Sequence, residues 1–358
     1  MVRHVEGSPG VSAPESRVTP VKVLVASDLC PRALRHLQAR HDLRLAIGAE
    51  ESELRAAIAD RDVLVFRSGV EITRAVLASA PSLRVLIRAG SGLDNLDVAF
   101  ARERRLILFR IPEPGAQAVA ELAFAFMLHL AREVRWNDQE IRQGHWTKAS
   151  TTGYLLRGKI LGIVGAGNIG SRVGEMGAAW GMKPLACVES PTPGVRDQLA
   201  SKGIRLVDLK EVAERADFLT IHVPKQASTL NLIGRDVLSW MKPTAFLINL
   251  ARGGVVDEEA LLEGLTGPGA PAGAALDVHA VEGQGSISPL ASLENVVLTP
   301  HIGATTVDTQ RQIGERVIEI LDAFGRAPDS FSPMTDDGAS GLLIPRTSDP
   351  THPTTTGL

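Results

Sequence analysis

The chain has 358 residues, 44% of them apolar, a formal net charge of −3 and a sequence pI of about 6.3. This length favours two domains with well-developed cores. The near-neutral charge argues against binding to nucleic acid or to a membrane through bulk electrostatics. Two cysteines, Cys30 and Cys187, are too few for a disulfide framework and fit no metal site, so we expect a reducing compartment and no bound metal.

The two ends of the chain differ in composition from the rest. Residues 1–20 and 327–358 are rich in Gly, Pro, Ser and Thr, and we expect both segments to be disordered tails. Residues 1–20 contain no apolar stretch of the kind found in a signal peptide. The apolar run 118–131 is too short for a membrane span. We therefore expect a cytoplasmic protein.

Between these ends, strand-like and helix-like segments alternate, which predicts an α/β fold with parallel sheets. Helix-like segments such as 52–59 and 172–180 separate many of the predicted strands. A helix over 118–135 is apolar on nearly all faces, so we expect it to be buried and to be a candidate subunit contact. The predicted strands, all apolar runs, cover 21–26, 62–66, 84–88, 107–111, 160–165, 185–188, 218–223, 245–250, 274–278 and 296–298.

A glycine-rich turn follows the predicted strand 160–165. Gly165, Gly167 and Gly170 have the G-x-G-x-x-G spacing of dinucleotide-binding folds, which allows a tight turn, close approach of a pyrophosphate and close helix packing. Glu189 follows the next strand, where a carboxylate accepts hydrogen bonds from the adenosine ribose and repels a 2′-phosphate. The pattern predicts NAD binding in preference to NADP; the alternative is a tight turn without a ligand.

Side chains that can carry a positive charge follow three later strands: Arg252, His301 and His222. Arg252, with two glycines after it, lies where open α/β sheets bind ligands, and its guanidinium can clamp a carboxylate. An arginine paired with a surface acid is the alternative. His301 follows the strand 296–298, and imidazole is suited to proton transfer near neutral pH. His222 also ends a strand and competes with His301, and a structural role is open for either histidine.

Taken together, these segments resemble the D-isomer-specific 2-hydroxyacid dehydrogenases, and among them the phosphoglycerate dehydrogenases, over about residues 21–325. The motifs that carry the resemblance are Arg67-Ser68, Arg88-Ala89-Gly90-Ser91-Gly92-Leu93-Asp94-Asn95, Val119-Ala120-Glu121, the glycine turn, Ala251-Arg252-Gly253-Gly254, Leu276-Asp277-Val278, Glu282 and Pro300-His301-Ile302-Gly303.

The resemblance implies a catalytic trio of Arg252, Glu282 and His301. His301 would be the general acid and base, Glu282 would hold its imidazole, and Arg252 would bind the substrate carboxylate. Further implied substrate contacts are Arg67, Ser68, Arg88, Gly90, Ser91 and Gly92, although the arginines could equally be ion-paired surface residues. The implied cofactor contacts are Gly165, Gly167, Asn168, Ile169, Gly170, Glu189, Val223, Ala251, Arg252, Asp277, His301 and Ala304.

The resemblance also implies the architecture. We expect two Rossmann-like or flavodoxin-like parallel-sheet domains, with an NAD-binding domain at 116–301 inserted into a substrate-binding domain at 21–115 and 302–326. A short form without a C-terminal regulatory domain is expected, as is a homodimer formed through the nucleotide domain.

The implied function is NAD-dependent, reversible oxidation of a D-2-hydroxy acid, with 3-phosphoglycerate as the favoured substrate and a place in serine biosynthesis. A hydroxypyruvate or glyoxylate reductase is the alternative, because segments that border the expected pocket, such as 281–286, depart from the family pattern. An NAD(H)-sensing interaction protein similar to co-repressors of this fold is the alternative from another class.

Overall fold

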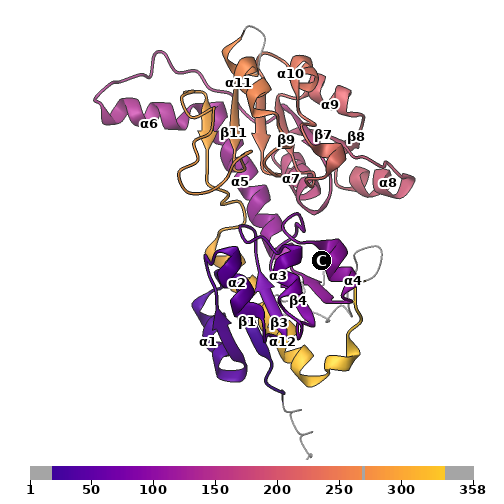
Figure 1. Cartoon of the computed structure of the whole chain (residues 1–358). Helices are drawn as coiled ribbons and strands as arrows, with labels where there is room; N and C mark the ends of the chain where they lie inside the picture. Colours follow the sequence, from indigo (N-terminus) through magenta and orange to yellow (C-terminus); the bar gives the residue numbers. More distant parts are fainter. Residues whose placement is uncertain (1–17, 268–270, 335–358) are drawn as a thin grey trace, which may run out of the picture. The chain divides into compact units, whose positions relative to one another are not determined.

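The computed structural model describes residues 18–267 and 271–334, so most of both predicted tails lies outside the described residues. The described chain forms two compact units (Figure 1). The first contains 18–89, 95–110 and 314–334, and the second contains 90–94, 111–267 and 271–313. These divisions differ from the predicted domain boundaries at 115/116 and 301/302. The observed second division, between Ile313 and Gly314, lies inside the helix α12 (Val307–Arg326) rather than before it.

The first unit is built on a five-stranded parallel sheet with the order β2-β1-β3-β4-β5, the order of flavodoxin-like folds. Four helices, α1 (Pro31–Arg40), α2 (Glu51–Ile58), α3 (Arg74–Ala78) and α4 (Val98–Glu103), connect successive strands. The strands are β1 (Lys22–Val25), β2 (Asp42–Leu45), β3 (Val63–Phe66), β4 (Val85–Arg88) and β5 (Ile107–Arg110).

The segment 327–334 corrects the predicted C-terminal tail. It contains a short 3₁₀ helix, η2 (Pro328–Ser330), and then packs on the first unit. The Phe331 ring lies 5.4 Å from the Phe109 ring between centroids. Met334 is buried, and its N–H donates to the Leu106 carbonyl at 3.1 Å. Two apolar side chains therefore outweigh the polar composition of this stretch.

The second unit contains a seven-stranded parallel sheet with the order β12-β11-β10-β9-β6-β7-β8. The chain runs outward from β6 to β8 and then returns to β9 on the other side of β6. The topological switch point of this doubly wound sheet therefore lies between β6 and β9, where ligands of such sheets bind. The strands are β6 (Ile160–Val164), β7 (Lys183–Cys187), β8 (Arg205–Leu206), β9 (Phe218–Ile221), β10 (Phe246–Asn249), β11 (Gly273–Leu276) and β12 (Val296–Leu298).

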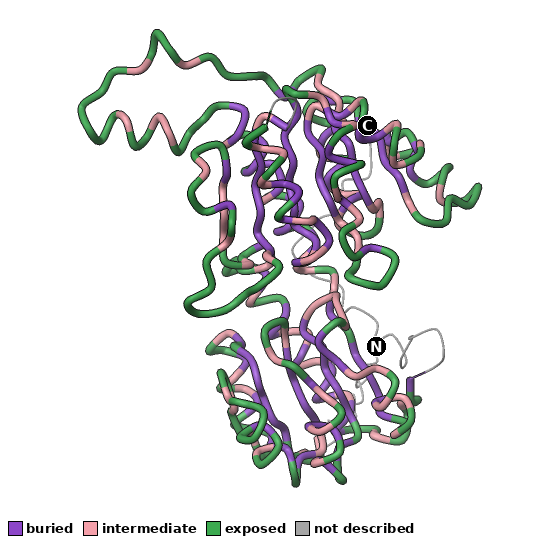
Figure 2. The backbone as a smooth tube through the Cα atoms, turned by 45° about the horizontal axis from the view of Figure 1, so that its top comes forward, coloured by how far each residue is buried: buried purple, intermediate pink, exposed green. Residues whose placement is uncertain are grey.

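Helices cover both faces of this second sheet, with a separate apolar core on each face. One face carries α5 (Glu113–Arg132), α7 (Asn168–Ala179) and α8 (Pro193–Ser201); the other carries α9 (Leu209–Arg215), α10 (Arg235–Trp240) and α11 (Glu258–Thr266). Figure 2 shows the strands buried between these partly exposed helices. Two parallel-sheet α/β units confirm the predicted fold class.

The predicted helix over 118–135 is divided in the structure. α5 ends at Arg132, because Glu133 adopts a left-handed conformation with φ of 49°, and α6 (Val134–Arg142) begins directly after it. Among the described helices, only α5 is long and apolar enough to cross a membrane, and half of its apolar window is buried inside the unit. Such burial is typical of a core helix.

Candidate active site

The turn between β6 and α7 has room for an anion at its glycines. Gly165 has a φ of +90°, and a Cβ on Gly170 would lie 2.0 Å from the Gly165 carbonyl oxygen, so both positions require glycine. A Cβ on Gly167 would meet no atom within 4 Å, which leaves open space at the N-terminus of α7. Backbone N–H groups at a helix N-terminus favour a phosphate. The turn therefore fits a dinucleotide pyrophosphate.

Glu189 lies two residues beyond β7, close to the same turn. Its carboxylate accepts hydrogen bonds from Gln226 Nε2 and from Ser228 Oγ, each at 3.2 Å. Gln226 and Ser228 follow β9, on the other side of β6, and Ser228 belongs to the 3₁₀ helix η1 (Ala227–Thr229). The carboxylate is thus held beside the switch point of the sheet. The sequence pattern did not single out Gln226 or Ser228, although both follow β9, the strand that pairs with β6 beside the glycine turn.

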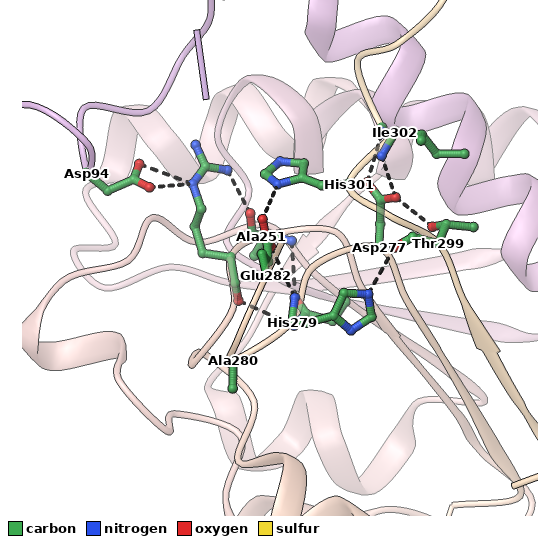
Figure 3. Close-up of polar contacts among 12 residues, drawn as sticks. Asp94, Ala251, Asp277, His279, Ala280, Glu282, Thr299, His301 and Ile302 are labelled. Carbon is green, nitrogen blue, oxygen red and sulfur yellow. Dashed lines mark hydrogen bonds and ion pairs between the residues drawn. The ribbon is translucent and has the colours of Figure 1, made fainter. Parts of the chain in front are cut away.

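His301 and Glu282 form a hydrogen-bonded pair after β12 and β11 (Figure 3). His301 Nδ1 lies 3.0 Å from Glu282 Oε2. Burial alone would raise the pKa of Glu282, but the His301 hydrogen bond and the positive charge of a protonated His301 hold that pKa below its usual value. An ionised Glu282 fixes the imidazole and leaves Nε2 as the ring nitrogen for proton exchange with a substrate.

Asp277 holds the turn that carries His301. His301 has a positive φ of 54°, which a non-glycine residue rarely adopts. The carboxylate of Asp277, 2% exposed, accepts hydrogen bonds from Thr299 Oγ1 at 2.6 Å and from the N–H groups of Ile302 at 2.8 Å and Gly303 at 2.7 Å. Both oxygens therefore stabilise this turn. The predicted contact of Asp277 with the cofactor stays a prediction.

Arg252 follows β10 and lies close to the segment that carries Glu282. A Cβ on Gly253 would lie 1.7 Å from the His279 carbonyl oxygen, so glycine lets the two backbones touch. The His279 N–H in turn donates to Glu282 Oε1 at 3.2 Å. Because β10, β11 and β12 are neighbouring parallel strands, their carboxyl ends place Arg252, Glu282 and His301 along one edge of the second unit.

Two further polar residues at this edge escaped sequence reasoning. Asp94 accepts hydrogen bonds from Arg252 Nε at 3.1 Å to each carboxylate oxygen. His279 Nε2 lies 2.9 Å from the Thr299 carbonyl oxygen. Neither has a spacing pattern of its own, although Asp94 lies within a segment that carries the family resemblance and His279 directly follows another.

His222, the competing histidine, has surroundings suited to a structural role. Burial lowers its pKa to about 3. Its Nε2 lies 2.9 Å from Thr220 Oγ1, and its carbonyl oxygen would lie 2.9 Å from a Cβ on Gly165. A buried imidazole that remains neutral is a poor general acid at neutral pH.

The predicted substrate residues fall into two groups. Gly90, Ser91 and Gly92 belong to the second unit, and a Cβ on Gly92 would lie 2.0 Å from Arg252 Nη2. Arg67, Ser68 and Arg88 belong to the first unit, so their role toward the substrate stays a prediction. Arg88 is 3% exposed, and burial lowers the pKa of Arg67, so neither is a solvated surface arginine.

The remaining predicted cofactor residues all belong to the second unit. Asn168 and Ile169 begin α7, Ala251 donates its N–H to Asn249 Oδ1 at 3.1 Å, and Val223 lies against Gly165. Ala304 lies near Gly115, where an added Cβ would be 3.3 Å from the Ala304 Cβ. The described residues contain no group of three His, Cys, Asp or Glu side chains that could hold a metal ion.

Comparisons with known proteins show which family the chain resembles. Residues 124–303 match the NAD-binding domain model of the D-isomer specific 2-hydroxyacid dehydrogenases. A D-3-phosphoglycerate dehydrogenase from Methanocaldococcus jannaschii is 39% identical over 301 residues, which are 84% of this chain and 56% of that protein. This chain thus spans little more than half the length of the phosphoglycerate dehydrogenases that it matches.

Two further relatives match over most of their length. A hydroxypyruvate reductase from Thermotoga maritima is 39% identical over 75% of this chain and 87% of its own. The structure of an NADPH-dependent glyoxylate/hydroxypyruvate reductase from Sinorhizobium meliloti, solved with NADP and malonate, has a TM-score of 0.77 at 28% identity and covers 91% of this chain and all of its own. A family domain model matches half of the chain, a relative matches over most of its own length, and the expected motifs are present. The chain therefore belongs to the D-isomer specific 2-hydroxyacid dehydrogenase family, and its second unit contains the NAD-binding domain of that family.

Proposed function

We propose that the protein catalyses the reversible, NAD-dependent oxidation of a D-2-hydroxy acid. The observation that carries this proposal is the 3.0 Å pair between His301 Nδ1 and the Glu282 carboxylate, at the sheet edge that also bears Arg252. An imidazole with an ionised carboxylate behind it and a guanidinium nearby can move a proton and bind a carboxylate together. Oxidation of a hydroxy acid requires both of these tasks.

Each residue of the trio has one chemical task. Bound NAD supplies the acceptor for the hydride that leaves C2 of the substrate. His301 Nε2 removes the proton of the 2-hydroxyl group, and the Glu282 carboxylate stabilises the resulting imidazolium through Nδ1. Arg252 holds the substrate carboxylate and stabilises negative charge on the reacting oxygen. In the reverse direction, His301 returns the proton to that oxygen.

The favoured substrate is 3-phosphoglycerate. The names of the phosphoglycerate dehydrogenase relatives support this choice. Two arginines such as Arg67 and Arg88 would suit a substrate that carries both a carboxylate and a phosphate. A hydroxypyruvate or glyoxylate reductase is the second candidate. The Thermotoga relative favours it, because it is equally similar and this chain covers much more of its length.

The test is a direct assay with the purified protein. Loss of the NADH absorbance band is followed with 3-phosphohydroxypyruvate, hydroxypyruvate and glyoxylate in turn. Preference for the phosphorylated compound supports the first candidate, and preference for hydroxypyruvate or glyoxylate supports the second. His301→Gln should lower kcat by about 10²- to 10⁴-fold while NADH still binds. NADH binding without turnover of any 2-oxo acid would instead indicate an NAD(H)-sensing protein.

A cytoplasmic homodimer is part of the same proposal. α6 has no buried residues, and α6 with the segment after it extends away from the rest of the second unit (Figure 1). Apolar side chains on this arm, residues 134–155, are exposed, including Ile141, Trp146 and Leu155. Several large apolar side chains exposed on one projecting arm favour a role of this arm as a protein interface. Cys30 and Cys187 are free thiols, consistent with a reducing compartment.

A further inference from the structure

Asp94 contacts the arginine that the proposed mechanism assigns to the substrate. It lies in the loop 90–94 of the second unit, and each of its carboxylate oxygens is 3.1 Å from Arg252 Nε. The side chains of Arg252 and Asp94 are only 22% and 33% exposed. Solvent and salt screen such a pair less than they screen a fully exposed one. The contact is therefore able to restrain the guanidinium.

The other nitrogens of Arg252 show the orientation that results. Nη1 donates to the Ala251 carbonyl oxygen at 2.7 Å. Nη2 lies against Gly92, where an added Cβ would be only 2.0 Å away. Because Asp94 accepts from Nε and the Ala251 carbonyl oxygen accepts from Nη1, the plane of the guanidinium is fixed. Its Nη2 group is then next to the glycine loop predicted to bind the substrate carboxylate.

We propose that Asp94 is a positioning residue, which fixes the orientation of Arg252 so that Nη2 and the second Nη1 proton can bind the substrate carboxylate. This inference rests on the proposed dehydrogenase function. An arginine side chain samples many rotamers, and each unproductive rotamer weakens the binding of a small anion. A carboxylate on Nε selects one rotamer without using the Nη1–Nη2 end, which is the end suited to a second carboxylate.

The same contact could instead make Asp94 a placeholder that competes with the substrate for Arg252. The two roles predict opposite effects of removing the Asp94 charge. Loss of a positioning residue raises KM, whereas loss of a competitor lowers KM. Attachment through Nε favours positioning, because a competitor would be expected at the Nη1–Nη2 end.

The kinetic test is a double-mutant cycle with Asp94→Asn and Arg252→Ala, assayed with hydroxypyruvate and NADH. Asp94→Asn retains the shape of the side chain but removes its charge. We expect kcat/KM to fall about tenfold, mainly through a higher KM, because a charge-assisted hydrogen bond is lost. In the Arg252→Ala background the same substitution should change kcat/KM less than about twofold, because its target is absent. The NADH dissociation constant should not change.

A matched control comes from the neighbouring segment. Asp97 caps α4 by accepting a hydrogen bond from the Phe100 N–H at 2.8 Å. Asp97→Ala removes this cap and should lower the melting temperature without changing KM, which separates structural damage from loss of positioning. A lower KM for Asp94→Asn, or an equal effect in both backgrounds of the cycle, would overturn the proposal.

A second measurement does not depend on turnover. The Arg252 Nε–H signal in a ¹⁵N-labelled sample, assigned by its loss in Arg252→Lys, should exchange slowly with water in the parent protein and rapidly in Asp94→Asn. Equal exchange in both proteins contradicts the proposal. If the parent reduces no 2-oxo acid, the proposed function fails, and this signal still decides whether Asp94 restrains Arg252.

Discussion

At the scale of single residues, the carboxylate of Glu189 is placed to distinguish the two nicotinamide cofactors. Gln226 and Ser228 hold it beside the β6–α7 turn through hydrogen bonds of 3.2 Å. A fixed negative charge there accepts hydrogen bonds from ribose hydroxyls and repels a 2′-phosphate. Cofactor preference should therefore depend on this one charge.

We expect Glu189→Gln to raise the ratio of kcat/KM with NADP to kcat/KM with NAD by about tenfold, because the repulsion of the 2′-phosphate is lost. Initial rates with both cofactors and one 2-oxo acid measure the ratio. Glu175→Gln is the control, because Glu175 pairs with Lys202 on the surface of the same unit and should leave the ratio unchanged. An unchanged ratio in Glu189→Gln would remove Glu189 from cofactor discrimination.

The sequence singled out Arg252 and His301 because each follows a predicted strand, and the family resemblance added Glu282. In the structure these three residues follow three neighbouring strands, β10, β11 and β12. The hydrogen bonds of Asp277 to the His301 turn, about 25 residues away in the sequence, depend on a backbone conformation that no local pattern specifies. No local pattern specifies the contact of Asp94 with Arg252 either, because the two residues are 158 positions apart in the sequence.

At the scale of elements, buried strands were predicted well, and the two strands that were missed both lie at sheet edges. β2 was missed because three of its four residues are exposed, and β8 because it has only two residues. The break between α5 and α6 was missed because Glu133 is not a residue that marks a left-handed turn. By contrast, the buried end of β9 was predicted, and it places a neutral His222 inside the second unit.

His222 makes the second unit less stable in acid. Its folded-state pKa, about 3, lies below the ordinary imidazole pKa of 6.5, so below pH 6.5 the unfolded chain binds a proton that the folded unit does not. The contribution of His222 to the free energy of unfolding is fully present above the unfolded-state pKa. It is lost progressively as the pH falls from there toward 3. Between about pH 8 and about pH 5 the loss should be about 2 kcal/mol.

Urea unfolding followed by tryptophan fluorescence measures this loss, because Trp136, Trp146, Trp180 and Trp240 all belong to the second unit. We expect His222→Gln to reduce the fall in unfolding free energy over this pH range. His145→Gln, which alters an exposed imidazole of the same unit, should leave the fall unchanged. An equal pH dependence in the parent and in His222→Gln would show that His222 is not its source.

At the scale of the whole molecule, alternation of strands and helices was enough to predict two parallel α/β units. The strand orders required the structure, because apolar runs do not specify which strands are neighbours. The projecting arm, residues 134–155, was also not predicted. Its residues are polar enough to resemble a surface helix and loop, and only the structure shows that Ile141, Trp146 and Leu155 remain uncovered.

We expect the purified protein to have the mass of two chains of 38.1 kDa each by light scattering. The double substitution Trp146→Glu and Leu155→Glu should reduce this to the mass of one chain, because it places two charges in an apolar interface. Leu45→Glu, at an exposed apolar position of the first unit, is the control and should remain dimeric. A double variant that keeps the parent mass would exclude the arm as the interface.

The return of α12 to the first unit has a consequence for biosynthesis. On the ribosome, all five strands of the first sheet emerge before the second unit is made, but α12, the helix that packs on α1, is translated after that unit. The hydrogen bond between Arg40, at the end of α1, and Asp322 is 2.8 Å long in the finished fold. It cannot form until Asp322 has been translated, 282 residues later. The unit that is translated first is therefore completed last, and a nascent chain that stalls before α12 would leave the apolar surface of the first sheet open to chaperones.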